Sequence, residues 1–236
     1  MHLVSISFDD GFLASSVRTA EIFERRGLRA CLNIVATGHL RPWWPAELGL
    51  GSIPIGDFAL WNELRARGHE IMPHGYRHAN KKQLPLAEAQ KLITDCLAIL
   101  NAELHGFDAR QAVFNFPYNA STPELHAWLP TVVRAFRTGG DAINPMPAPG
   151  LAHLTSSGFG PGRCDQDLDK WVARLLARPS GWLIYCAHGL EDEGWGPMGA
   201  DYLERLLDRL QAIPTVRIMP VGQALAAADA AQASKR

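Results

Sequence analysis

The segment SISFDDGF, residues 5–12, places two adjacent aspartates at the end of an apolar run. Residues 2–8 have the composition of a buried strand, and a helical pattern follows within a few residues. Adjacent carboxylates repel one another, and burial raises the free energy needed to keep both ionised. Either Asp9 and Asp10 form an ordinary turn with Gly11, or a positive charge lies beside them. Gly11 is free to adopt backbone angles that would turn both carboxylates into one cleft.

Beyond this segment, strand and helix patterns alternate along the whole chain. Alternation on this scale favours parallel strands joined by helical crossovers. We therefore expect an α/β fold, a distorted (β/α) barrel with seven or eight parallel strands, in which residues 1–236 form a single domain. An open doubly wound sheet is the alternative, although the first strand–helix turn lacks a glycine-rich phosphate fingerprint. The predicted strands cover residues 2–8, 29–36, 69–72, 112–116, 131–136, 151–155, 182–187 and 215–219.

Composition excludes several classes of protein. Of the 236 residues, 47% are hydrophobic, which is enough for a full core. The 23 basic and 24 acidic residues nearly cancel, and no basic run suggests a nucleic-acid partner. No apolar stretch reaches the roughly 18 residues of a membrane span, and no signal-peptide pattern precedes residue 3, so we expect a cytoplasmic protein unless a leader was removed. The cysteines are scattered and predicted to be free buried thiols: Cys31, Cys96, Cys164 and Cys186.

Polar residues follow four of the predicted strands at their carboxyl ends, which meet at one face of a barrel. His74 and His78 lie four residues apart, a spacing that lets both imidazoles face one ion. A carboxylate would complete three protein ligands and leave an open position, as in catalytic metal sites. The four groups of residues are Asp9 and Asp10; His74 and His78; Asn115, Pro117 and Tyr118; and His188.

The motifs SFDDG, HGYRH, NFPY and CAHG resemble, in order and spacing, those of the polysaccharide deacetylases, carbohydrate esterase family 4. The resemblance runs from the first strand to the helix after His188. It implies a distorted barrel and metal-dependent hydrolysis of an N-acetyl group on a sugar, or of a related non-peptide amide. The roles that it implies are metal ligation by Asp10, His74 and His78, general base catalysis by Asp9, general acid catalysis by His188, and an oxyanion contact from the backbone N–H of Tyr118.

These implied roles agree with the chemistry of the residues. A divalent ion, zinc or else cobalt or nickel, lowers the pKa of a bound water and polarises a carbonyl. A nearby carboxylate takes the proton of that water, and a histidine protonates the leaving amine. A backbone N–H aimed at the developing oxyanion stabilises it further.

Two departures from the family pattern stand out. The third motif usually begins with an arginine that steadies the catalytic aspartate, and Asn115 takes that position here. A neutral amide donates no bidentate pair and lowers no neighbouring pKa in the way that arginine does. The fourth motif, an acidic residue near a tryptophan, is not distinct. Three aspartates before Trp171 are candidates, although they fit a helix cap and first turn better: Asp165, Asp167 and Asp169.

Aromatic and polar residues near the same face are predicted to contact a small-molecule or oligosaccharide substrate. The loop after the second strand carries Trp43 and Trp44, which either stack on a sugar or pack against the rim. Trp195, shortly after His188, is placed on the leaving-group side. The full set predicted to bind substrate is Trp43, Trp44, Asn115, Pro117 and Trp195.

Two other functions stay open at this point. A two-histidine, one-carboxylate iron oxygenase uses similar ligands, but usually with one histidine next to the acid and the other distant. A carbohydrate-binding relative without turnover is the second, favoured by Asn115 and opposed by the presence of Asp9 and His188. The sequence determines neither the exact substrate nor the oligomeric state.

Overall fold

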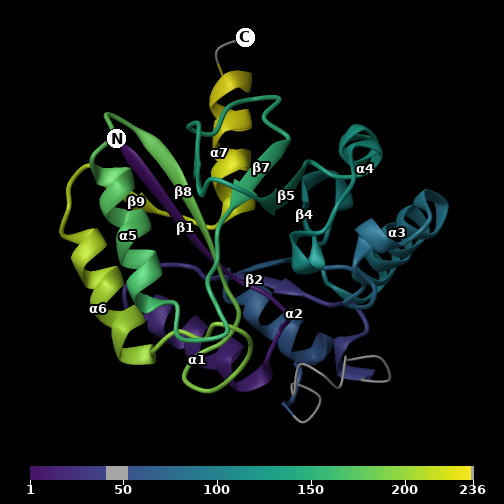
Figure 1. Cartoon of the computed structure of the whole chain (residues 1–236), viewed down its shortest axis with the longest axis horizontal. Coiled ribbons are helices and arrows are strands. Elements are labelled where there is room, and N and C mark those ends of the chain that lie inside the picture. The colour runs from purple at the N-terminus through teal and green to yellow at the C-terminus, as the bar shows by residue number, and fades with distance from the viewer. Residues whose placement is uncertain (41–52, 235–236) are drawn as a thin grey trace.

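Strands and helices alternate through the computed structural model, which describes residues 1–40 and 53–234 (Figure 1). The strands of the described residues are β1 (His2–Phe8), β2 (Cys31–Ile34), β3 (Glu70–Pro73), β4 (Val113–Asn115), β5 (Ala135–Gly139), β6 (Ile143–Asn144), β7 (His153–Ser156), β8 (Gly181–Ala187) and β9 (Val216–Ile218). The α-helices are α1 (Leu13–Glu24), α2 (Phe58–Ala66), α3 (Leu86–Glu103), α4 (Pro123–Trp128), α5 (Asp165–Leu176), α6 (Ala200–Gln211) and α7 (Val221–Ala233).

β1 is the centre of a six-stranded sheet with the order β3-β2-β1-β8-β6. All seven residues of β1 pair with β8, from His2 opposite Gly181 to Phe8 opposite Ala187. On its other edge, β1 pairs first with β9 and then with β2, so one long strand organises most of the sheet. Because every pair except β6–β8 is parallel, the carboxyl ends of β1, β2, β3 and β8 lie at one edge.

The predicted α/β class with parallel strands is confirmed, but the predicted barrel is not continuously closed. A second sheet, β4-β5-β7, is separate from the first among the described residues. Between β3 and β4 the described chain has no backbone ladder, and contact there includes a hydrogen bond from the Val113 N–H to Met72 Sδ at 3.4 Å. At the other junction a single bridge joins Ser157 to Tyr185 on β8. Since β3 ends at a proline and β4 is only three residues long, regular pairing between them has little backbone to use.

Side chains of β1 alternate between two environments, as in any strand. Val4, Ile6 and Phe8 face the covering helices, where the Phe8 ring meets Phe23 of α1 edge to face. Ser5 and Ser7 lie on the opposite face of the sheet, which is the inner face. The Ser5 hydroxyl accepts a hydrogen bond there from the buried Trp182 indole at 2.9 Å. The next residue on that inner face is position 9, so the strand itself directs the first aspartate inward.

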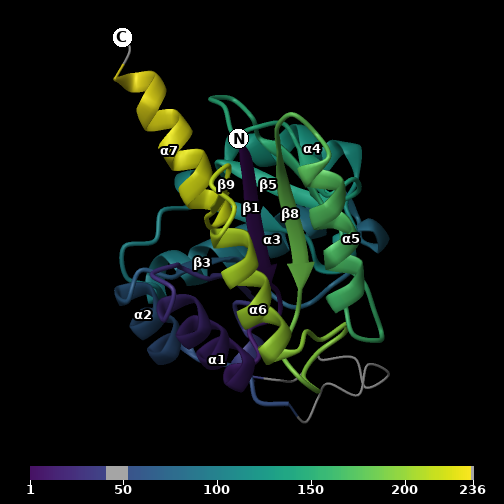
Figure 2. The same ribbon diagram turned by 90° about the vertical axis from the view of Figure 1, so that its left-hand side faces the viewer.

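Helices lie along the outer side of the strands (Figure 1 and Figure 2). In Figure 2, α5 lies to one side of β1 and β8, while α6 and α7 cross on the other. The apolar face of α3 is buried, with residues at helical spacing: Leu92, Ile93, Cys96, Leu97 and Leu100. All four cysteines are free and buried, as predicted. Among the described residues, no helix combines the length and apolarity that crossing a membrane requires.

One strand lies further along the chain than predicted. Residues 131–136 read as a strand, whereas β5 begins at Ala135 and ends at Gly139. The β-branched residues at 131–133 favour a strand, but Pro130 starts a turn at Leu129–Thr131 that removes them from it. The shift brings Arg137 into the middle of β5.

Candidate active site

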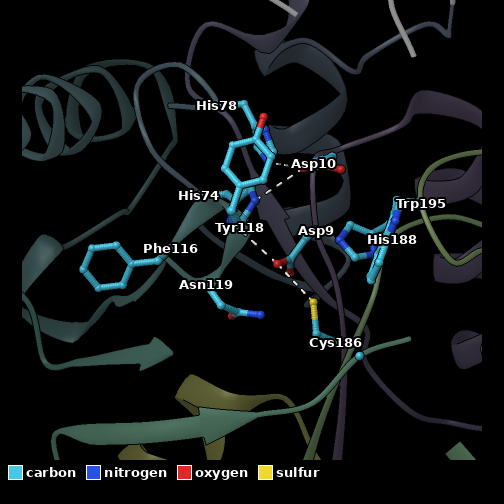
Figure 3. A pocket seen from close by; sticks show the side chains of 11 residues that line it. Asp9, Asp10, His74, His78, Phe116, Tyr118, Asn119, Cys186, His188 and Trp195 are labelled. Carbon is cyan, nitrogen blue, oxygen red and sulfur yellow. Dashed lines mark hydrogen bonds and ion pairs between the residues drawn. The ribbon is translucent and has the colours of Figure 1, made fainter. Parts of the chain in front are cut away.

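The two aspartates at the tip of β1 point in different directions into one cavity (Figure 3). Asp9 continues the strand, because its N–H donates to the Ala187 carbonyl at 2.9 Å. Asp10 then has φ of 78° and Gly11 φ of 82°, so two successive residues adopt the left-handed conformation. Aspartate tolerates that region better than most non-glycine residues. The turn therefore depends on Asp10 as well as on the predicted Gly11, and it is what separates the two carboxylates.

Asp10, His74 and His78 form a set that fits a metal ion. The Asp10 Oδ1 atom lies 3.2 Å from His78 Nε2 and 3.4 Å from His74 Nε2. Ligands about 2.1 Å from a tetrahedral ion are about 3.4 Å apart, so these separations match a zinc-sized centre. Oδ1 is buried and has no hydrogen-bond partner among the described residues, as expected of an atom reserved for a cation. The donor set is thus suited to a divalent ion.

The segment after β3 aims both histidines at Asp10. His74 Nδ1 donates to the Asn115 carbonyl at 3.1 Å, which leaves Nε2 available to bind an ion. Gly75 has φ of 95°, and the chain turns there toward His78, whose ring lies 4.5 Å from that of Tyr118. Behind this turn, the buried Lys81 ammonium donates to the Ala79 carbonyl at 3.1 Å. Burial lowers the pKa of Lys81 to about 8.

Asp9 is held by four side chains of the inner face. Asn33 donates to Oδ1 at 2.6 Å, and Arg137 of β5 forms a short ion pair with Oδ2. The Cys186 thiol lies 3.2 Å from Oδ2, and His74 Nδ1 lies 3.7 Å from it. Burial alone would raise the pKa of Asp9, but the charge of Arg137 and then of the nearby histidines holds it well below its usual range. The Asp9 carboxyl therefore stays ionised even though a second carboxyl, that of Asp10, is its neighbour in the chain.

Arg137 is a site residue that the sequence interpretation missed. It is fully buried, and its guanidinium contacts Ser7, Asp9 and Cys186. Arg137 of β5 lies opposite Asn115 of β4 in the parallel pair. The guanidinium therefore comes from β5, whereas the arginine of the family motif would lie on β4. The signal was an isolated arginine in AFRTG, residues 135–139, within an otherwise small and apolar strand.

His188 follows β8 and faces the cavity across from the metal-ligand set (Figure 3). Burial lowers its pKa, so the imidazole is held toward the neutral form. The edge of the Trp195 ring lies against it, with centroids 5.4 Å apart. No hydrogen-bond partner for the buried Nδ1 occurs in the part of the chain that the structure describes.

The segment that follows His188 is fixed to α1 and α6. Glu193 accepts hydrogen bonds from the N–H and the hydroxyl of Ser15 in the first turn of α1. The Ser15 hydroxyl in turn accepts from the Leu190 N–H at 2.8 Å. Glu191 accepts from the N–H of Ala200 at the start of α6 at 2.9 Å. Helix α1 begins at Leu13 without a side-chain cap of its own, and Glu193 of this neighbouring loop accepts from its first turn instead.

The cavity has a volume of about 360 Å³ and is lined by Cys186 of β8 and by residues of the segments that follow β1, β3, β4, β7 and β8. It brings together seven predicted residues: Asp9, Asp10, His74, His78, Tyr118, His188 and Trp195. It also has lining residues that were not predicted: Phe116, Asn119, Gly158 and Cys186.

The remaining candidates lie elsewhere. Asn115 and Pro117 do not line the cavity, and the Asn115 amide donates instead to the carbonyls of Val113 at 2.9 Å and Pro73 at 3.4 Å. Trp43 and Trp44 lie outside the described residues. Asp165 and Asp167 lie in the first turn of α5, as predicted, but the cap position is Cys164 rather than an aspartate. The three aspartates before Trp171 accept hydrogen bonds from other parts of the chain: Asp165, Asp167 and Asp169.

The fold is similar to that of several solved carbohydrate esterases and deacetylases. A family 4 acetyl xylan esterase from Clostridium thermocellum, solved with a cobalt ion, aligns with a TM-score of 0.63 and 16% identity over 95% of this chain and 90% of its own. A peptidoglycan N-acetylglucosamine deacetylase aligns with a TM-score of 0.62 and 14% identity over 94% and 92% of the two chains. A carbohydrate esterase family 4 pseudoenzyme from Bacillus anthracis aligns at 0.59 and 11% over 94% and 65%.

At these identities the likeness establishes the fold, which is that of carbohydrate esterase family 4 structures. The predicted resemblance to polysaccharide deacetylases is confirmed at that level. The sequence itself matches no family model and no curated protein. Because deacetylases and a pseudoenzyme share the fold, the fold alone does not determine activity, which depends on the side chains of the site.

Proposed function

We propose that this chain is a metal-dependent hydrolase that removes an acetyl group from an N-acetylated sugar or cleaves a related non-peptide amide. The observation that carries the proposal is the division between the two aspartates. Asp10 turns toward two histidine Nε2 atoms, while Asp9 turns away from them toward Arg137. A metal ligand and a separate base are what hydrolysis by an activated water requires.

The proposed cofactor is a divalent ion held by Asp10, His74 and His78, with zinc as the first candidate and cobalt or nickel as alternatives. Such an ion supplies an acidified water and polarises the carbonyl of the scissile amide. The cobalt-bound esterase of the same fold supports the choice of metal class. A histidine that binds a metal usually donates its other ring N–H to a fixed acceptor. The Asn115 carbonyl accepts such a bond from His74 Nδ1 and so fixes the tautomer and orientation of His74.

Asp9 and His188 would move the protons. Asp9 is ionised and lies beside the ligand set, so it can accept a proton from the attacking water. His188 lines the other side of the same cavity and, in its protonated form, which the charges of Asp10 and Asp9 favour against burial, would deliver a proton to the leaving nitrogen. A base and an acid on two sides of one cavity allow attack and departure at the two faces of an amide.

Tyr118 and Trp195 are proposed to contact the substrate. Tyr118 has φ of 57°, a left-handed conformation in a tight turn, and we assign its backbone N–H to the developing oxyanion. Trp195 is 40% exposed at the cavity, beside His188, and offers a ring face to a sugar on the leaving-group side. The cavity volume suits one sugar unit with its acyl group rather than a longer segment buried at once.

The test is release of acetate from N-acetylated oligosaccharides by the full chain loaded with zinc or cobalt. We expect release that requires metal and falls by about 100-fold to 10,000-fold in Asp9→Asn, the usual contribution of a general base. Trp171→Phe, a change away from the cavity, is the matched control. If the metal-loaded protein binds oligosaccharides and releases no acetate from any N-acetyl sugar, the chain is a binding protein of the same fold.

A further inference from the structure

A second group of potential ligands lies on the other side of Asp9 from the metal-ligand set. Asp9, Cys186 and His188 each offer a ligand atom, and these atoms all lie within 4.8 Å of one another. The Cys186 sulfur is 3.2 Å from Asp9 Oδ2 (Figure 3). All three residues line the cavity, so an ion could enter and could keep a position open toward it.

The chemistry of this group differs from that of the first set. A thiolate, an imidazole and a carboxylate together suit zinc and softer ions such as cadmium, whereas magnesium and calcium prefer oxygen ligands. His188 Nδ1 is buried without a hydrogen-bond partner in the described residues, so the ring has an uncommitted polar atom. We propose that Asp9, Cys186 and His188 form a second, soft-metal site, and that an ion bound there blocks hydrolysis.

The second site is weaker than the first for a reason visible in its contacts. Arg137 lies against both Asp9 Oδ2 and, at 3.6 Å, the Cys186 sulfur. Its positive charge opposes a cation at this position, and Asn33 already occupies Asp9 Oδ1. Asp10 Oδ1 carries no such bonds among the described residues. Binding at the second site also releases the thiol proton to solvent. An ion should therefore fill the first site at low concentration and the second only in excess.

An ion in the second site would engage both residues that are proposed to transfer protons, Asp9 and His188. Asp9 as a ligand could no longer accept a proton, and His188 as a ligand could no longer donate one. This inhibitory part rests on the proposed function, whereas binding of the ion does not. Excess zinc is thus expected to inhibit without displacing the first ion.

Cobalt(II) titration of the full chain tests binding independently of activity. A cobalt–thiolate bond gives a charge-transfer absorption band that oxygen and nitrogen ligands do not. We expect one cobalt per chain without the band and a second, weaker one with it, displaced by zinc. Cys186→Ser should abolish the band and weaken the second ion by at least about tenfold. Cys164→Ser, which changes a buried cysteine outside the cavity, should leave the band unchanged.

His78→Ala separates the two sites, because it should lose the first ion and keep the thiolate band. Circular dichroism shows whether each variant is folded, and wild type alone already tests the proposal. A folded wild type that shows no thiolate band at any cobalt concentration overturns it, as does a band that survives in Cys186→Ser. If the band appears and acetate is never released, the metal site stands and the proposed hydrolase fails.

Discussion

Removal of the Arg137 guanidinium is the sharpest test of how the site is held together. Arg137 is fully buried and Asp9 is 3% exposed, so neither charge is solvated well enough to stand alone. Loss of one partner of a buried ion pair destabilises a protein by about 3–5 kcal/mol, because the other charge stays buried and unpaired. We expect Arg137→Met, which keeps much of the side-chain volume, to lower the free energy of unfolding of the metal-free protein at pH 7 by that amount.

The double variant distinguishes this cause from lost packing. When both charges are removed, no unpaired charge is left in the core, and the loss should be much smaller. Arg137→Met combined with Asp9→Asn should therefore be more stable than Arg137→Met alone by about 2 kcal/mol or more, so that the two single losses are strongly non-additive. Urea unfolding of wild type, both single variants and the double variant, at constant m-value, measures the four free energies.

The register of β4 and β5 adds a rescue experiment. Since Asn115 and Arg137 are register partners, Asn115→Arg in the Arg137→Met background would return a guanidinium from the neighbouring strand. We expect it to recover part of the stability. The reasoning is refuted if Arg137→Met is within 1 kcal/mol of wild type, or if the double variant loses the sum of the two single losses.

Three further predictions concern single residues. Asp10→Asn should lose the first metal ion while Asp9→Asn keeps it, and metal analysis after dialysis shows whether the two roles are instead reversed. His188→Ala should keep the first ion and lose most acetate release, so a loss of that ion would reassign His188 as one of its ligands. Because burial lowers the pKa of Lys81 to about 8 from 10.5, the folded protein binds that proton less tightly than the unfolded chain. Lys81→Met should then raise the free energy of unfolding by up to about 3 kcal/mol at pH 7, and this gain should shrink between pH 8 and pH 10.5. Urea unfolding over that pH range measures the gain, and a gain that does not depend on pH would contradict the prediction.

The order of elements was predictable from sequence because hydrophobic periodicity is local. Residues 182–187 are a continuous apolar run and residues 2–8 are largely apolar, and both are buried strands that pair with each other. Closure of the barrel was not predictable, since it depends on whether β3 and β4 meet with matching backbone groups. The residue pattern within each strand does not indicate whether the two strands pair.

The site was predictable where adjacent residues carry it and not where distant residues meet. Asp9 with Asp10, and His74 with His78, are short motifs, and the cavity brings them together. Arg137 was missed because strand propensity at 131–133 put the strand four residues too early and ended it before the arginine. Cys186 was assigned as an ordinary buried thiol, and only the fold reveals that its sulfur faces Asp9.

The left-handed backbone at Asp10 restricts which descendants of this sequence can arise. With φ of 78°, position 10 accepts aspartate, asparagine or glycine with little strain, and it disfavours glutamate, the other residue that would retain the charge. The substitutions at position 10 that suit this backbone conformation therefore replace a carboxylate with a neutral residue. They leave β1, α1 and the walls of the cavity in place. A lineage can lose its chemistry here without losing its fold, which is the state represented by a pseudoenzyme among the structures that share it.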